Sequence, residues 1–306
     1  MADIYTRITK NRRIEKNASF DRKSANIRYS IGSILLISAL GLAVIYGAAG
    51  VINMAHGEFI MLGAYSTYTL QSTMGLPFLL CIPCAFFIVG IIGFVIERNL
   101  ICYLYNRPLD TLLATWGVSL VLMQSSRLIF GSDVKYIAMP EFLSTNLELG
   151  ILNFSTFRLF LIAVALILLF ITWFIFYRTR LGIKIRAVTQ NKEMAASFGI
   201  NAAQVYSITF AFGAGLAGAA GAMFGALSIV LPTMGMHYVV EAFLMVVTGG
   251  GSILGTVFAS TLAGEIQSIF AFIFNDTMAR GLLFILIVVL LRFRPQGLLS
   301  TGSGRR

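Results

Sequence analysis

The chain has 306 residues, of which 58% are hydrophobic and only 12% are charged. Soluble domains average about 25% charged residues, so too little polar surface remains here for a protein surrounded by water. The formal net charge is +10, but the basic residues lie between apolar segments and form no aromatic-interleaved basic domain. We therefore expect a membrane protein that binds no nucleic acid.

Apolar stretches along the chain predict membrane helices, since a full crossing takes about 20 apolar residues. They fall at residues 31–50, 57–74, 77–97, 111–130, 158–177, 205–227, 238–260, 262–275 and 279–293. We expect an all-α, polytopic transmembrane helical bundle with about eight crossings and with broken or re-entrant segments. The transmembrane domain is expected to span residues 29–298, between a basic N-terminal tail (1–28) and a short C-terminal tail (299–306).

The placement of charge predicts the topology. Lys and Arg gather in residues 1–28, in the 97–110 and 178–204 loops and at the C-terminal end, whereas the 131–157 loop is mostly acidic. By the positive-inside rule, the basic segments and both termini lie in the cytosol of a bacterial plasma (inner) membrane. An even number of crossings must then precede residue 98. Three apolar stretches lie there, so one of them is expected to be broken or re-entrant.

The segment Val51–Glu58 is the weak point in the apolar pattern. It reads V-I-N-M-A-H-G-E and places Asn53, His56 and Glu58 within apolar sequence. Ionisable groups inside a membrane are costly and usually face a bundle interior, and irregular backbone is tolerated only against a cavity or other protein. We expect this segment to line a solute path, although each side chain could instead make a structural contact between helices.

Other polar residues in the apolar stretches are further candidates for the path. His237 and Glu241 lie in a segment that loosely echoes Met54–Glu58, as internal repeats around a substrate would predict, although the echo could equally arise by chance. Thr115 and Gln124 could also contribute, but residues nine apart are not clearly on one face of a straight helix. The remaining intramembrane ionisable candidates are Arg127, Glu265, Asp276 and Arg280.

Glycines and cysteines carry structural expectations. Gly221 and Gly225 have the spacing that lets membrane helices approach closely, and Gly249–Gly251 could break another helix. The run Gly250–Thr256 lacks the lysine of a phosphate loop, so no nucleotide site is expected there. Cys81 and Cys84 have redox spacing but lie in an apolar run, which favours buried thiols. We expect no metal and no cofactor.

The 178–204 loop is the most informative of the basic segments. Good helix formers run from Lys192 to Phe198, and Gly199 suits a helix C-cap. The short helix presents Met194, Ala195 and Phe198 together, a pattern that a solvated loop does not need but that a helix docked in a partner's groove does.

These residues resemble a known family. The run Glu193–Gly199 (E-M-A-A-S-F-G) resembles the E-A-A-x-x-x-G coupling loop of ABC importer permeases, with Met194 in place of the first alanine. I-N-M-A-H-G-E-F (52–59), R-T-R-L-G with R-A-V-T-Q-N (178–191) and R-P-Q-G-L (294–298) resemble the branched-chain amino acid and urea permeases. Residues 107–120 and 129–136 resemble the urea branch. The ATPase-coupling residues that this implies are Arg186, Glu193, Met194, Ala195, Phe198 and Gly199.

The resemblance implies a permease subunit with no enzymatic activity of its own. Its partners would be separate ABC ATPase subunits, a second related permease chain and a periplasmic or extracellular solute-binding protein. We expect urea as the solute, with branched-chain amino acids as the alternative. A stand-alone channel or ion-coupled transporter using Glu58, Glu241 and Glu265 is a different possibility, but it would not need an ATPase-coupling loop. An intramembrane enzyme is not supported, since no H-E-x-x-H or G-x-S-x-G motif occurs.

Overall fold

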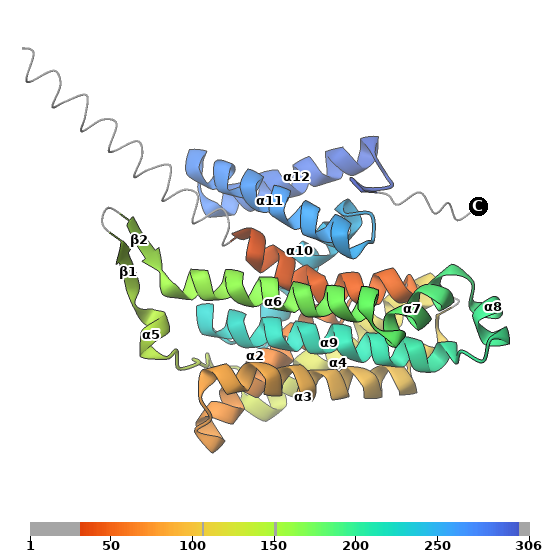
Figure 1. The fold of residues 1–306 in the computed structure, drawn as a ribbon. Helices are drawn as coiled ribbons and strands as arrows, with labels where there is room; N and C mark the ends of the chain where they lie inside the picture. The colour runs from red at the N-terminus through yellow and green to blue at the C-terminus, as the bar shows by residue number, and fades with distance from the viewer. Residues whose placement is uncertain (1–30, 106, 150–151, 300–306) are drawn as a thin grey trace, which may run out of the picture.

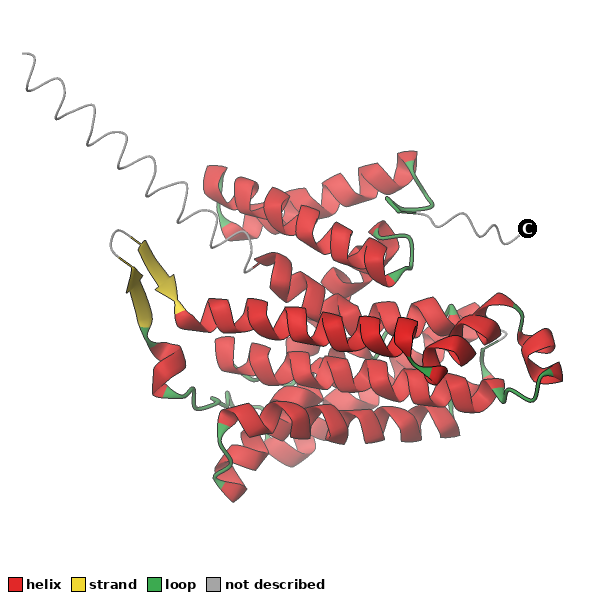
Figure 2. Cartoon of the chain, in the orientation of Figure 1, coloured by secondary structure: helices red, strands yellow, loops and turns green. Residues whose placement is uncertain are grey.

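The computed structural model describes residues 31–105, 107–149 and 152–299 (Figure 1). The described chain is a bundle of long helices with one small hairpin at one end (Figure 2). The first described helix covers Ile31–Ala49. The other elements are α2 (His56–Met74), α3 (Phe78–Asn99), the 3₁₀ helix η1 (Ile101–Tyr103), α4 (Pro108–Phe130), α5 (Glu141–Ser144), β1 (Asn146–Leu149), β2 (Leu152–Ser155), α6 (Thr156–Arg178), α7 (Arg180–Gln190), α8 (Lys192–Ser197), α9 (Ala202–Leu227), α10 (Met234–Thr248), α11 (Ile253–Ile273) and α12 (Asp276–Phe293).

Within the described residues, six helices are long and apolar enough to cross a membrane: Ile31–Ala49, α3, α4, α6, α9 and α11. Helix α4 shows the distribution of side chains that lipid requires, with polar groups facing the protein and apolar groups facing outward. The buried residues of α4 are all hydroxyl-bearing: Thr111, Thr115, Ser119 and Ser126. Its exposed side carries large apolar side chains such as Trp116 and Leu128. The prediction of a polytopic helical bundle is therefore confirmed.

Helix α9 lies at the centre of the bundle, and its glycines let neighbouring backbones reach it. A Cβ atom on Gly221 would overlap the carbonyl of Ile60 in α2, and one on Gly213 would overlap the carbonyl of Gly41. Helix α3 packs along the same helix, where Gly93 leaves room only for the methyl group of Ala214. These small residues replace side-chain volume with close backbone contact, as the glycine pattern predicted.

The C-terminal helices are divided at Gly249–Gly251, where the sequence indicated that a helix could break. The sequence suggested apolar stretches at 238–260 and 262–275, but α10 ends at Thr248 and α11 begins at Ile253. Gly250 and Gly251 both have positive φ, 75° and 72°. Side chains rarely adopt that conformation, so the glycine run ends α10 even though the flanking sequence stays apolar.

The chain passes between two ends of the bundle. It runs toward the α7 end in the helix Ile31–Ala49, back toward the hairpin β1–β2 in α2, and toward the α7 end again in α3 (Figure 1). Of these three helices, Ile31–Ala49 and α3 are long and apolar enough to cross a membrane, whereas α2, which follows the break at Val51–Ala55, is not among the candidate spans of the described residues. This division agrees with the expectation that one of the three apolar stretches before residue 98 is broken. The predicted N-terminal tail (1–28) and all of the predicted C-terminal tail (299–306) except Leu299 lie outside the described residues.

Candidate functional site

The break before α2 is built from backbone that finds its partners in side chains. Gly50 has a φ of 66° and ends the first described helix. The side-chain oxygen of Asn53 then accepts a hydrogen bond from the Ala55 amide at 3.1 Å. The Met54 amide donates to the Thr115 hydroxyl of α4, also at 3.1 Å. A buried amide without a partner costs free energy, so Asn53 and Thr115 together make the irregular segment possible.

Three polar atoms in the break (Val51–Ala55) and in the first turn of α2 have no hydrogen-bond partner among the described residues. They are Nδ2 of Asn53, Nδ1 of His56 and the second carboxylate oxygen of Glu58. These side chains are only 1%, 0% and 2% exposed. Buried polar groups are nearly always hydrogen-bonded, so three orphans within six residues distinguish this segment from a purely structural turn.

The two ionisable side chains in the first turn of α2 contact different helices. The Nε2 atom of His56 lies 2.9 Å from the Ser38 carbonyl, so Nε2 carries the donated proton. The Glu58 carboxylate faces the Ser119 hydroxyl of α4. His56 therefore contacts the middle of the helix Ile31–Ala49, and Glu58 contacts the hydroxyl face of α4. The break lies deep in the bundle, with all three groups enclosed.

A second helix begins at the same point. The backbones of Gly57 in α2 and Gly235 in α10 are in direct contact, because a Cβ atom on either would overlap the other's carbonyl. Neither helix has a side-chain cap at its N-terminus: Ala55 precedes α2 and Thr233 precedes α10 without such a hydrogen bond. Two helix N-termini, each with a partial positive charge, therefore meet inside the bundle.

The structure brings some of the predicted path residues together and separates others. Thr115 is buried and contacts the break directly. Gln124 and His237 are exposed on the surface of the chain. Glu241 pairs with Arg280 of α12 at 3.8 Å. Glu265 lines a separate, mostly apolar cavity of about 320 Å³ with Gly32 and Thr261.

The predicted coupling helix is present as α8. The side chain of Asn191 caps it by accepting from the Met194 amide at 2.9 Å. Gly199, with a φ of 76°, ends the turn that follows. Met194 and Phe198 are 57% and 80% exposed, so two large apolar side chains face away from the bundle. Such exposure is typical of a docking surface.

Of the other predicted coupling residues, Ala195 faces inward and Arg186 contacts the end of α6. Ala195 is only 3% exposed and packs against α7 and α9, so it does not share the face of Met194 and Phe198. Residues one apart on a helix point in different directions, which accounts for the difference. Arg186 donates to the Phe176 carbonyl and lies 5.8 Å above the Tyr177 ring. It fixes α7 to the end of α6, while Glu193 is exposed.

A buried cluster at the base of α8 had no sequence signal. Glu97 is fully buried and accepts a 2.7 Å hydrogen bond from the Tyr105 hydroxyl. Burial, followed by this hydrogen bond, raises the pKa of Tyr105, so the phenol stays protonated. The Tyr105 ring lies 4.7 Å from that of Tyr206, above which Lys192 sits at 6.0 Å. Ser119, in contrast, could have been found from its spacing of four after Thr115.

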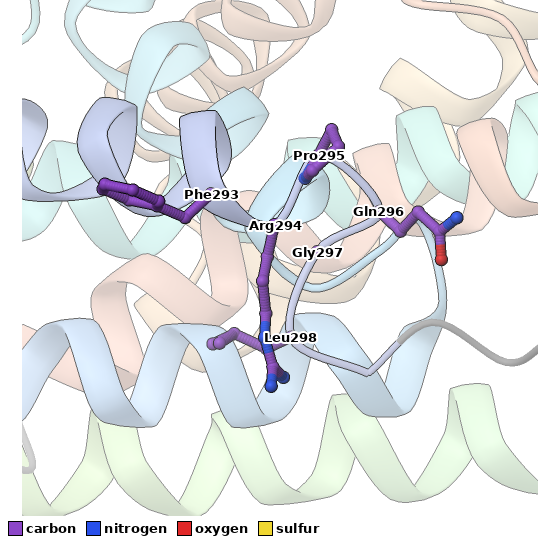
Figure 3. A pocket seen from close by; sticks show the side chains of 6 residues that line it. All are labelled: Phe293, Arg294, Pro295, Gln296, Gly297 and Leu298. Carbon is purple, nitrogen blue, oxygen red and sulfur yellow. The ribbon is translucent and has the colours of Figure 1, made fainter.

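Another cavity lies near the C-terminal end of the described chain. It has a volume of about 450 Å³ and is lined by the C-terminal turn Phe293–Leu298. Figure 3 shows the side chains of Arg294 and Gln296 pointing in different directions around it. The Leu298 amide donates to the Thr248 carbonyl at 2.7 Å, which fixes the turn to the end of α10. None of the predicted path residues lines it, so we do not assign the solute path there.

The fold and the site define a multi-pass membrane permease. A family model described as the permease component of branched-chain amino acid transport systems matches residues 28–291. The chain belongs to this family of ABC transporter permeases, which are transport subunits and not enzymes.

Individual relatives agree with the family. BraD of Pseudomonas aeruginosa, a high-affinity branched-chain amino acid permease protein, is 31% identical over 294 residues, covering 89% of this chain and 93% of its own. LivH of Salmonella typhimurium is 30% identical over 288 residues, covering 89% and 92%. LivM of Escherichia coli is 28% identical over 291 residues, covering 87% and 68%. No solved structure matches the chain.

Proposed function

We propose that this chain is one of two permease subunits of an ATP-driven importer for branched-chain amino acids, in a bacterial inner membrane. The family match over residues 28–291 carries the proposal. The descriptions of LivH and LivM as permease proteins of such systems support a second, related permease chain as partner. Separate ABC ATPases would dock on Met194 and Phe198, and a periplasmic or extracellular binding protein would deliver the solute.

The chemistry of the break suits a zwitterion. An α-carboxylate is stabilised by the positive dipole ends of helix N-termini, and α2 and α10 start beside one another at Gly57 and Gly235. An α-ammonium group needs acceptors, and the unpartnered oxygen of Glu58 supplies a charged one. The path therefore runs past the break and along the hydroxyl face of α4.

Urea, which the resemblance at residues 107–120 and 129–136 favoured, uses less of this arrangement. It is neutral and needs hydrogen-bonding groups and a narrow path, which Asn53 and Thr115 can supply. It gains little from two helix N-termini and a carboxylate. The descriptions of BraD, LivH and LivM all name branched-chain amino acids. We therefore place branched-chain amino acids before urea.

The test is uptake of labelled leucine and of labelled urea in cells that carry the complete gene cluster, with and without this subunit. We expect leucine uptake that depends on the subunit and on ATP, and that unlabelled valine and isoleucine compete for. Urea uptake that depends on the subunit, with no leucine uptake, would restore the urea assignment. In the same cells, Glu58→Gln should weaken leucine uptake at least tenfold by removing the charge that faces the ammonium group.

A further inference from the structure

One helix touches both the coupling segment and the break. At one end of the helix Ile31–Ala49, the Ala48 carbonyl accepts a hydrogen bond from the Thr189 hydroxyl of α7 at 3.2 Å. Thr189 shares this hydrogen with the Ile185 carbonyl of its own helix at 2.9 Å. This contact joins residues 141 positions apart in the sequence. The coupling segment α7–α8 is thereby attached to the end of a helix that enters the core.

Ten residues earlier, the same helix meets the break. The Ser38 carbonyl accepts a hydrogen bond from Nε2 of His56 at 2.9 Å. A rise of 1.5 Å per residue separates Ser38 from Ala48 by roughly 15 Å along the helix. The two hydrogen bonds thus connect the cytosolic coupling segment to the solute path through a single element.

This helix has little freedom to absorb a displacement within itself. It is continuous from Ile31 to Ala49 and contains no proline. Its residues from Leu35 to Ile45 are almost completely buried, and Gly41 lies directly against the Gly213 carbonyl of α9 and the His56 ring. Packed interiors transmit a shift instead of deforming locally. A displacement applied at Ala48 therefore arrives at Ser38.

We propose that the helix Ile31–Ala49 transmits movement of the coupling segment to the break, with Thr189 and His56 as positioning residues at its two contacts. The proposal rests on the proposed function, in which an ATPase moves α8. When α7–α8 shifts, Thr189 draws the end of the helix with it. Ser38 then moves the His56 ring, and with it the start of α2 at the crossing with Gly235.

The first test is Thr189→Val in the complete transporter, reconstituted in vesicles. Valine keeps the shape of threonine and loses the hydroxyl that reaches Ala48. The matched control is Thr261→Val in α11, because the hydroxyl of Thr261 bonds only the Val257 carbonyl of its own helix. We expect the solute imported per ATP hydrolysed to fall about fivefold in Thr189→Val, as the loss of one net hydrogen bond predicts. Thr261→Val should stay unchanged.

The second test reports on the break itself and does not depend on the identity of the solute. Ile52→Cys, in a chain whose three native cysteines are replaced by alanine, should react with a small hydrophilic thiol reagent at a rate that changes when the ATPases are trapped with vanadate. Thr189→Val should abolish that change while ATP hydrolysis continues. Thr189→Val with a normal import ratio and a normal vanadate response would overturn the proposal.

A double variant distinguishes transmission from local damage. His56→Gln removes the imidazole that meets Ser38, and Thr189→Val removes the other contact. If both act through one helix, the double variant should be no worse than the more impaired single variant. Additive losses would show two independent roles and would overturn the proposal. If wild type imports urea and not leucine, the proposed solute is wrong, whereas the vanadate response still decides this inference.

Discussion

The break before α2 and the coupling segment before α9 use the same local chemistry in opposite surroundings. Each is a short irregular stretch stabilised by an asparagine whose side-chain oxygen accepts a backbone amide: Asn53 from Ala55, and Asn191 from Met194. Around Asn53 the polar side chains of Asn53, His56 and Glu58 are enclosed, and some of their atoms lack partners among the described residues. Around Asn191 the unpartnered groups are apolar, because Met194 and Phe198 face outward.

The difference agrees with the two roles proposed for these regions. Inside a membrane bundle, an unsatisfied donor or acceptor is the costly feature, which supports the proposal that the break meets a polar solute. In water, an exposed apolar side chain is the costly feature, which supports the proposal that α8 meets a protein partner. The asparagine-capped backbone is the same in both regions, so it does not distinguish their functions. The groups that the neighbouring helices leave without partners do distinguish them.

The largest expected effect comes from crowding the enclosed region. Gly57→Ala places a methyl group on the Gly235 carbonyl, and two backbones cannot separate without moving α2 from α10. We expect a loss of about 3 kcal/mol or more, at the upper end of overpacking costs. Thermal unfolding in detergent measures it. The control is Gly117→Ala in α4, where an added Cβ meets nothing within 4 Å. Equal stability of the two variants would contradict the contact between the two helix starts.

The exposed region should respond in assembly and not in stability. Phe198→Ala removes the most exposed side chain of the coupling segment, so the free chain should unfold at the same temperature. Binding of the ATPase subunits should weaken about 30-fold, the effect of losing an interface residue worth about 2 kcal/mol. A pull-down titration in detergent measures this. Phe87→Ala, at a lipid-facing position of α3 that is 65% exposed, is the matched control. Equal affinity of both variants for the ATPases would remove Phe198 from the interface.

The smallest effect should come from the backbone that ends the coupling turn. Gly199 has a φ of 76° and nothing within 4 Å of an added Cβ, so Gly199→Val is strained without any clash. A residue other than glycine loses about 1–2 kcal/mol in the left-handed conformation. A β-branched residue such as valine should be near the upper end of this range. We expect a displaced α8, with ATP hydrolysis partly uncoupled from uptake. If uptake per ATP matched wild type, the conformation of Gly199 would not matter for coupling.

Much of the fold could be predicted because lipid imposes a simple rule on sequence. Long apolar runs predicted the helices. V-I-N-M-A-H-G-E predicted the break, since an amide and a carboxylate within an apolar run have to face protein or a cavity. The course of the broken stretch was harder to predict. The sequence indicated only that one of the first three stretches would be broken or re-entrant, whereas the structure shows that α2 starts beside α10, at the contact of Gly57 with Gly235.

The site could be predicted only where sequence neighbours carry it. Asn53, His56 and Glu58 were found together because six residues contain them. Thr189 and Ala48 were not predicted, because a hydroxyl in a polar helix and a carbonyl in an apolar one have no sequence pattern that reveals a contact 141 residues away. Ala195 was placed on the wrong face, because a six-residue helix is too short for periodicity to show which side is buried.

The contact of Gly57 with Gly235 also sets an order of events during synthesis. Residue 57 leaves the ribosome long before residue 235, at roughly 5–20 residues per second. For on the order of ten seconds or more, α2 has been made while the helix that supports its start has not. The polar groups of the break must wait in the translocon or in lipid without their final neighbours. Quality control of the nascent chain can therefore act on these polar groups only until α10 has been made.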